Sequence, residues 1–191
     1  YNAALRAKEL FKTELPQTSI EVLDSQTATP AEGFVALVAA RAAAEGKELS
    51  EVVNIAEDMK GRVSCAILLD TIRHVYRSGR IPKIASQVGS ILNIRPIFTV
   101  LGAVHFAGAV RSRERGIDRI LQIMRDKVGK SAAHVAVIHA YALEEAEKLK
   151  KRVLDEFNCV EVWLAEFSPV MGYACGTGTV GLAYYTEDGK N

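Results

Sequence analysis

Apolar residues recur with the 3.6-residue period of an α-helix in several segments of the chain. Glycine or proline follows several of these segments, as is usual where helices end. The pattern predicts helices from Ala3 to near Pro16 and at Ala31–Glu45, Ser50–Met59, Thr71–Tyr76, Ile84–Leu92, Gly116–Val128 and Leu143–Glu156.

Shorter apolar runs lie between these helices and predict strands. Two of the runs, residues 94–100 and 104–110, are separated only by three residues around Gly102 and therefore predict a β-hairpin. Strands and helices otherwise alternate, which indicates an α/β or α+β protein with a mixed sheet. The predicted strands are Ile20–Leu23, Val63–Leu69, Ile94–Val100, Val104–Val110, His134–His139, Val160–Leu164 and Gly181–Thr186.

The start of the helix at Ala31 has a pattern of its own. Thr29 is followed by Pro30 and then by Glu32, and this is the spacing of a capping box. In such a box the hydroxyl accepts a bond from the first turn of the helix, and the acid bonds back to the residue that carries the hydroxyl. The pattern therefore predicts that Thr29 caps this helix with its side chain.

A second interpretation of the same stretch concerns a ligand. Asp24 and Ser25 end a predicted strand just before the capped helix. In open α/β sheets, ligands lie beyond the carboxyl ends of strands, and a helix N-terminus attracts anions there. The hydroxyls of Ser25, Thr27 and Thr29 therefore have two equally good interpretations: they cap the helix, or they bind an anionic head group.

Composition narrows the class of protein. The chain has 191 residues, enough for one large or two small domains, and its 49% hydrophobic and 25% charged residues are ordinary for a soluble globular protein. Lys plus Arg number 24 and Asp plus Glu 23, a balance that speaks against a nucleic-acid partner. The densest basic stretch, Arg111–Arg115 with Arg119, also carries Glu114 and Asp118 and is interpreted as the solvated start of a helix.

Cysteine and histidine usage predicts neither a metal site nor another cofactor. The cysteines are odd in number and match no zinc spacing, which favours reduced thiols in a cytoplasmic protein. No histidine pairs with a glutamate in a helical zinc motif, and His134 and His139, five apart in one strand, point to opposite faces. No apolar run approaches the roughly 20 residues of a membrane span, so no stable membrane insertion is expected.

The stretch from Gly176 to Gly181 reads G-x-G-x-x-G. A dinucleotide site would need a helix after it and an acidic residue roughly 20 positions on, whereas a strand-like run follows here. A tight glycine loop can still hold a carboxylate with its backbone N–H groups, or it can be a plain connection between strands. Cys175 next to this loop is a candidate nucleophile, or an unreactive thiol.

Several segments, in the same order, resemble motifs of the DegV family, over about residues 18–186. Asp24-Ser25 with Thr29 and Gly33 is similar to its D-S-x-x-x-S/T-x-G-x-G segment. Further resemblances are Ser78-Gly79-Arg80-Ile81 to its G-G-R-I turn, Leu92-Asn93-Ile94-Arg95-Pro96-Ile97 to its L-N-I-K-P-I/L strand start, Gly102 with Arg111-Ser112-Arg113 to its G-x-(5–8)-K-x-R hairpin, and Pro169-Val170-Met171-Gly172 with Gly176-Thr177-Gly178 to its terminal glycine loop.

The resemblance implies a two-lobed α/β fold that encloses one long-chain fatty acid. Residues 1–60 would form the remainder of a parallel-sheet N-terminal lobe, and residues 61–191 a C-terminal lobe with a mixed or antiparallel sheet. It also implies a non-catalytic carrier that presents the carboxylate to a partner fatty acid kinase. Thr29 takes the place of the carboxylate-binding hydroxyl, and Arg80 lies near the lobe interface.

The chain departs from the family pattern in three places. The family's first strand and its hydroxyl loop have no counterpart, so the chain resembles an N-terminally truncated fragment. Ala174 stands where the terminal loop has a carboxylate-binding histidine. Ala31 and Thr177 replace a glycine and a proline of the motifs.

A fatty acid needs an apolar tunnel with a few polar groups at one end. Tunnel candidates beside the hairpin are Ile91, Leu92, Ile97, Phe98, Val100, Phe106 and Met124. The predicted ligand-binding residues are Ser25, Thr29, Arg80, Arg95, Cys175, Gly176, Ile91 and Phe98. Two alternatives stay open: an acyl or phosphoryl transferase that uses the Cys175 and Gly176 loop, and a binding module for another small amphiphile.

Overall fold

The computed structural model describes residues 1–78 and 94–187. The predicted helix at Ile84–Leu92 lies outside the described residues, and most of the other predicted elements form within a few residues of their expected bounds. In chain order the elements are α1 (Asn2–Glu14), α2 (Thr29–Ala44), α3 (Leu49–Arg62), β1 (Ser64–Leu68), α4 (Arg73–Arg77), β2 (Arg95–Leu101), β3 (Ala103–Val110), α6 (Arg113–Val128), β4 (Ala133–His139), α7 (Leu143–Glu156), β5 (Cys159–Glu166), α8 (Pro169–Cys175) and β6 (Val180–Thr186).

The described strands form one mixed sheet in the order β3-β2-β1-β6-β4-β5. Only β4 and β5 run parallel, joined by α7 as a crossover helix, and the other neighbouring pairs are antiparallel. The predicted hairpin is formed by β2 and β3, with Gly102 at φ 67° in its turn. These strands confirm the mixed sheet, and a second lobe is absent from the described residues.

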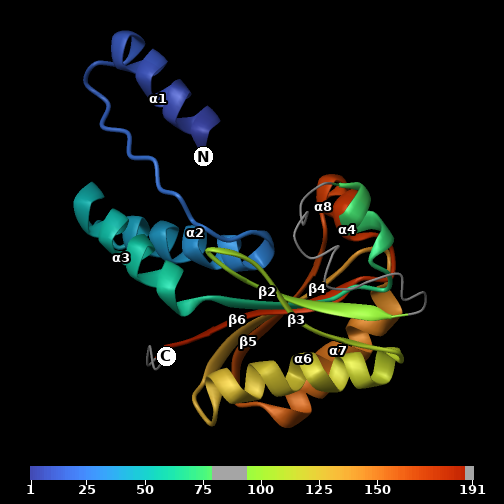
Figure 1. Cartoon of the computed structure of the whole chain (residues 1–191). Coiled ribbons are helices and arrows are strands. Elements are labelled where there is room, and N and C mark those ends of the chain that lie inside the picture. Colours follow the sequence, from blue (N-terminus) through green and yellow to red (C-terminus); the bar gives the residue numbers. More distant parts are fainter. Residues whose placement is uncertain (79–93, 188–191) are drawn as a thin grey trace.

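Helices cover both faces of the sheet (Figure 1). Along β1, Cys65 and Ile67 pack into the core under α2 and α3, whereas Ala66 and Leu68 pack into the core under α6 and α7. This period-2 alternation follows from the pleat of a strand, and it divides the apolar residues between two layers. Because α2 and α3 lie on the same sheet as the later helices, residues 29–62 and the strands share one core.

The two strand histidines obey the same alternation. His134 stacks on Tyr185, with ring centroids 4.4 Å apart, and its Nδ1 lies 2.6 Å from Glu161 Oε1. His139 points to the other face, where its Nδ1 accepts a bond from the backbone N–H of Ala142. Their predicted placement on opposite faces is therefore confirmed.

Two local predictions around α2 are wrong. Residues 20–23 form no strand, because within the described part of the chain no neighbouring strand pairs with them. The N-cap of α2 is Ala28, and no side chain caps the helix. Glu32 instead accepts a hydrogen bond from Ser25 Oγ at 2.9 Å, which removes the acid from the expected capping box.

Helix α1 stands away from the rest of the fold (Figure 1). None of its residues is buried. An ion pair of 2.9 Å between Lys8 and Glu21 fastens it to the extended stretch that leads to α2. The division of the chain into lobes at residue 60 stays a prediction. In residues 1–78 and 94–187, no helix has the length and hydropathy to cross a membrane.

Candidate functional site

A cavity of about 400 Å³ lies on the α2 face of the sheet, between the start of α2 and the pair α4 and α8. Its walls are mostly aliphatic and aromatic, with hydroxyls and a thiol among them. Its volume falls in the usual range of small-molecule sites. It is lined by Ala28, Thr29, Ile67, Leu69, Val75, Ser78, Phe98, Val100, Val104, Val170, Met171, Tyr173, Ala174 and Cys175.

Distant parts of the sequence meet here because of the sheet order. Strands β1 and β2 are neighbours, so Ile67 and Phe98 lie directly opposite each other in the ladder. Both side chains point to the α2 face, where Phe98 also packs edge-on against Phe106 of β3. The hairpin therefore supplies one wall of the cavity and β1 its floor.

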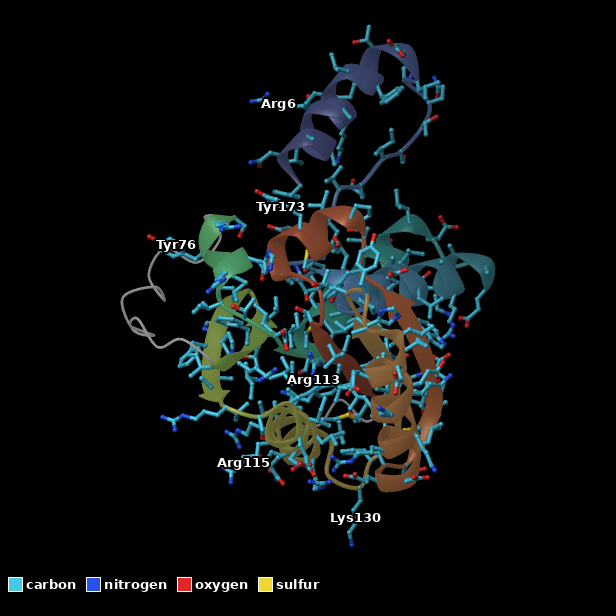
Figure 2. The ribbon with its side chains drawn as sticks, turned by 90° about the vertical axis from the view of Figure 1, so that its right-hand side faces the viewer. Arg6, Tyr76, Arg113, Arg115, Lys130 and Tyr173 are labelled. Atoms are coloured by element: carbon cyan, nitrogen blue, oxygen red, sulfur yellow. The ribbon has the colours of Figure 1, made fainter. Side chains whose placement is uncertain are left out.

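The opposite wall is α8, a helix where the sequence pattern predicts a loop. Pro169 occupies its first turn, and the Ser168 hydroxyl caps it by accepting a bond from the backbone N–H of Met171. These are helix-start signals, so the sequence did carry a sign of α8. Figure 2 shows Tyr173 on α8 and Tyr76 on the neighbouring α4, both in the outer layer of the molecule.

Thr29 forms a polar corner of the cavity. Its φ of 65° is unusual for a β-branched residue, and its Oγ1 lies 3.8 Å from the Sγ of Cys65. Since α2 lacks a side-chain cap, its first N–H groups and the positive end of its dipole also lie at this corner. The corner thus combines a hydroxyl with backbone N–H groups that no side chain caps, beside the Glu32 carboxylate in the first turn, and it suits a hydrogen-bonding head group.

The two thiols near this corner are not activated. Burial raises the pKa of Cys65 to about 12, although the hydrogen bond with Thr29 opposes the rise. Burial likewise raises the pKa of Cys175 to about 11. A thiol with so high a pKa stays protonated near neutral pH, whereas the thiolate is the nucleophile. A protonated Cys175 thus does not favour the alternative in which this thiol is a nucleophile.

The turn that follows α8 is fixed by close packing. Gly176 has φ 86°, and a Cβ there would overlap the imidazole of His74 on α4. Gly178 donates its N–H to the Ala140 carbonyl at 2.8 Å, and the Thr179 hydroxyl donates to the Cys175 carbonyl at 3.1 Å. The glycines thus permit close approach of the chain, and Gly176 lies beside the cavity without lining it.

An ionic cluster fastens this turn from the other side. Asp70 Oδ1 accepts bonds from Arg95 Nε at 3.1 Å and from Arg113 Nη2 at 2.8 Å. Arg113 Nη1 donates to the Gly178 carbonyl at 2.8 Å. Arg95, a predicted ligand residue, therefore belongs to a cluster that joins β1, β2, α6 and the glycine turn, and does not line the cavity.

A second, smaller cavity of about 260 Å³ lies between the loop before α2, the end of α3 and the hairpin turn. Ser25 lines this second cavity, where its hydroxyl bonds to Glu32. Val100 lines both cavities and so separates them. Ser25 and Thr29, which the sequence grouped together, hence lie in adjoining spaces.

The predicted ligand residues divide as follows. Thr29, Phe98 and Cys175 line the main cavity together, and Arg80 and Ile91 lie outside the described residues. Two tunnel candidates, Ile97 and Met124, lie in the core under α6 on the other face of the sheet. Lining residues that the sequence analysis did not name as ligand or tunnel candidates are Ala28, Ile67, Leu69, Val75, Ser78, Val104, Val170, Met171 and Tyr173.

Within residues 1–78 and 94–187, no three His, Cys, Asp or Glu side chains come together as a group that could hold a metal ion.

Comparison with known proteins shows which family the chain resembles. The family model described as an uncharacterised protein of the DegV family matches residues 1–187. A DegV domain-containing protein of Clostridium perfringens is 32% identical over 189 residues, which are 98% of this chain and 66% of that protein. The chain thus spans just under two thirds of the length of this relative.

Solved structures share the fold. A DegV family protein from Corynebacterium glutamicum superimposes with a TM-score of 0.87 at 24% identity, over 97% of this chain and 70% of the other. A second, from Thermus thermophilus and described for its fatty acid binding, matches with a TM-score of 0.82 at 26% identity, over 95% of this chain and 65% of the other.

Proposed function

The chain belongs to the DegV family, and we propose that it is a non-catalytic carrier that binds one long-chain fatty acid in the main cavity. The observation that carries this proposal is the composition of the cavity, an apolar space with the Thr29 corner at one side. An acyl chain is an apolar body with one polar end, and the cavity has the same division.

The tail would supply most of the affinity. Burying about 15 methylene groups contributes about 0.8 kcal/mol each, before the cost of ordering the chain and losing free motion. The walls that would accept it come from β1, β2 and α8, with Ile67, Phe98 and Met171 among the lining residues. The head group would then lie at the Thr29 hydroxyl and the start of α2.

The resemblance supports two further parts of the proposal. The carrier presents the carboxylate to a partner fatty acid kinase. The whole protein has an N-terminal lobe that includes part of residues 1–60 and a C-terminal lobe over 61–191, and α2 and α3 share the core of the C-terminal sheet. The head group lies near the interface of these lobes, with Arg80 close to it. We further propose that the protein acts in the cytoplasm, as its unpaired, reduced cysteines suggest.

Affinities for a series of saturated fatty acids test this function. Isothermal titration of the purified protein with acids of increasing length should show affinity rising by about an order of magnitude per two methylenes until the cavity is full, and then levelling. An affinity that does not change with chain length would mean that only the head group is bound. Fatty acid kinase and ATP added to the loaded protein should yield acyl-phosphate.

A further inference from the structure

A groove of about 480 Å³ runs between β3 and α6, on the face of the hairpin opposite the fatty-acid cavity. Ile97 points into this groove, and its neighbour Phe98 points into the cavity. The floor is apolar, and the wall formed by α6 is polar. The groove is lined by Ile97, Ala107, Gly108, Ala109, Val110, Arg115, Asp118, Arg119 and Gln122.

The arginines at the start of α6 differ in whether they have a carboxylate partner. Arg113 bonds to Asp70, and Asp118 is paired with Arg152 at 2.6 Å. Among residues 1–78 and 94–187, no carboxylate lies within 4.0 Å of the guanidinium groups of Arg115 and Arg119. Figure 2 places Arg113 between α6 and the sheet and Arg115 on the outside of the helix. The groove therefore carries uncompensated positive charge.

The other side of the groove is a sheet edge that no described strand covers. Strand β3 is the first in the sheet order, so within the described residues its outer side pairs with no strand. Natural edge strands usually carry charges, above all Lys, which prevent pairing with other chains. Strand β3 has no Lys, Arg, Asp or Glu, and its Val104 and Phe106 are exposed. An edge of this kind is suited to receive another strand.

We propose that an extended acidic segment of a partner protein adds to β3 as a further strand and places carboxylates on Arg115 and Arg119. The two arginines are one turn apart on α6, about 6 Å along the helix axis. Alternate side chains on one face of a strand are about 6.6 Å apart, so acidic residues at alternate positions match the arginines. The main chain supplies pairing, and the carboxylates supply selectivity.

A bulge in β3 determines which part of the strand the segment can pair with. A bulge leaves Ala107 without a partner in β2, because Phe98 pairs with Phe106 and Ile97 with Gly108. Gly108 is part of the bulge, with φ 130°, so regular pairing is expected from Ala109 on, beside the arginines. A second copy of this chain fits less well, since its own β3 offers no carboxylate and its arginines would face those of the first copy.

A fluorescent peptide in which Glu alternates with Val or Thr tests the proposal, with anisotropy as the readout. The R115A/R119A variant should bind it about tenfold more weakly than the wild type. The K130A/K151A variant removes equal charge from exposed positions away from the groove and should bind normally. A peptide with the same residues but its Glu grouped together, or with its backbone N–H groups methylated, should bind poorly.

A charge-reversal variant, R115E/R119E, tests the proposal even if R115A/R119A is unstable. R115E/R119E should lose the Glu peptide and bind a peptide in which Lys takes the place of Glu. Equal binding of the alternating and grouped peptides, or equal binding by all variants, would overturn the proposal. So would a dimer, seen by sedimentation, that R115E/R119E abolishes while no peptide competes with it. Fatty acid binding is measured alongside and should not change in any variant.

Discussion

The Oγ1 of Thr29 lies 3.8 Å from the Sγ of Cys65, although the two residues are 36 positions apart. Either atom can be the donor in this contact, and because burial keeps the Cys65 thiol protonated by raising its pKa to about 12, one of the two arrangements has the thiol donating to the hydroxyl oxygen. In that arrangement the hydroxyl proton can point toward a ligand in the cavity. This contact gives Thr29 a role that is separate from helix capping.

Replacing the hydroxyl tests that role. Thr29→Ala should weaken fatty acid binding by about 1.5–3 kcal/mol, because a hydrogen bond to a charged group is lost. The capping loss of about 1 kcal/mol should not appear, since no side chain caps α2. Thr29→Ser keeps the hydroxyl and serves as the control. Equal affinity of the alanine and serine variants in calorimetric titrations would show that Thr29 makes no such bond.

Thr29 should also carry backbone strain that Gly relieves. A β-branched residue at φ 65° is held in a sparsely populated region, at a cost of about 1 kcal/mol or more. Thr29→Gly is therefore expected to raise the free energy of unfolding by about 1 kcal/mol while it weakens fatty acid binding. Urea denaturation measures the first effect and titration the second. Loss of stability in the glycine variant would mean that the strain is absent.

Ala174 lines the cavity where related motifs have a histidine. Ala174→His should tighten fatty acid binding, and more so at a pH of about 5.5 than at about 8, because an imidazole is charged below its pKa of about 6.5. Titrations at both pH values, with wild type at each pH as the reference, give the difference. An affinity gain that is absent at both pH values would remove this end of α8 from the head-group site.

Burial of the thiols predicts a loss of stability at alkaline pH. The folded pKa of Cys65, about 12, lies above the ordinary value of 9.0, so the stabilisation is complete below pH 9.0 and is lost as the pH rises toward 12. Cys65→Ala should flatten the fall of unfolding free energy in this window by up to about 1.4 kcal/mol per pH unit. Urea unfolding across the window measures the slope. Parallel slopes for wild type and variant would contradict it.

Periodicity predicted most of the fold because it reports burial directly. The hairpin around Gly102 and the buried strand at His134–His139 have apolar patterns that only one structure satisfies. The expected strand at residues 20–23 failed because a strand also needs a neighbour, and pairing is a long-range property. The sequence alone cannot show which edge of the sheet has no neighbouring strand.

The site was harder to predict for the same reason. Thr29 and Phe98 share a cavity only because β1 lies beside β2 and α2 crosses above them. The sequence predicts Arg95 as a ligand residue, but its guanidinium is paired with Asp70, which no local sequence pattern links to it. Ile97 and Phe98 are adjacent in a strand, so only one of them can face the ligand. The sequence does not show which, because that depends on the helices that cover each face of the sheet.

Native mass spectrometry of the purified chain tests the fatty-acid site most directly. Under gentle conditions the protein should carry one fatty acid of about C14 to C18 per chain, matching a single acyl chain in the cavity of about 400 Å³. Organic extraction should release the same acid, and adding it back to stripped protein should raise the melting temperature. A chain that carries no lipid, and whose melting temperature no fatty acid raises, would contradict the proposed function.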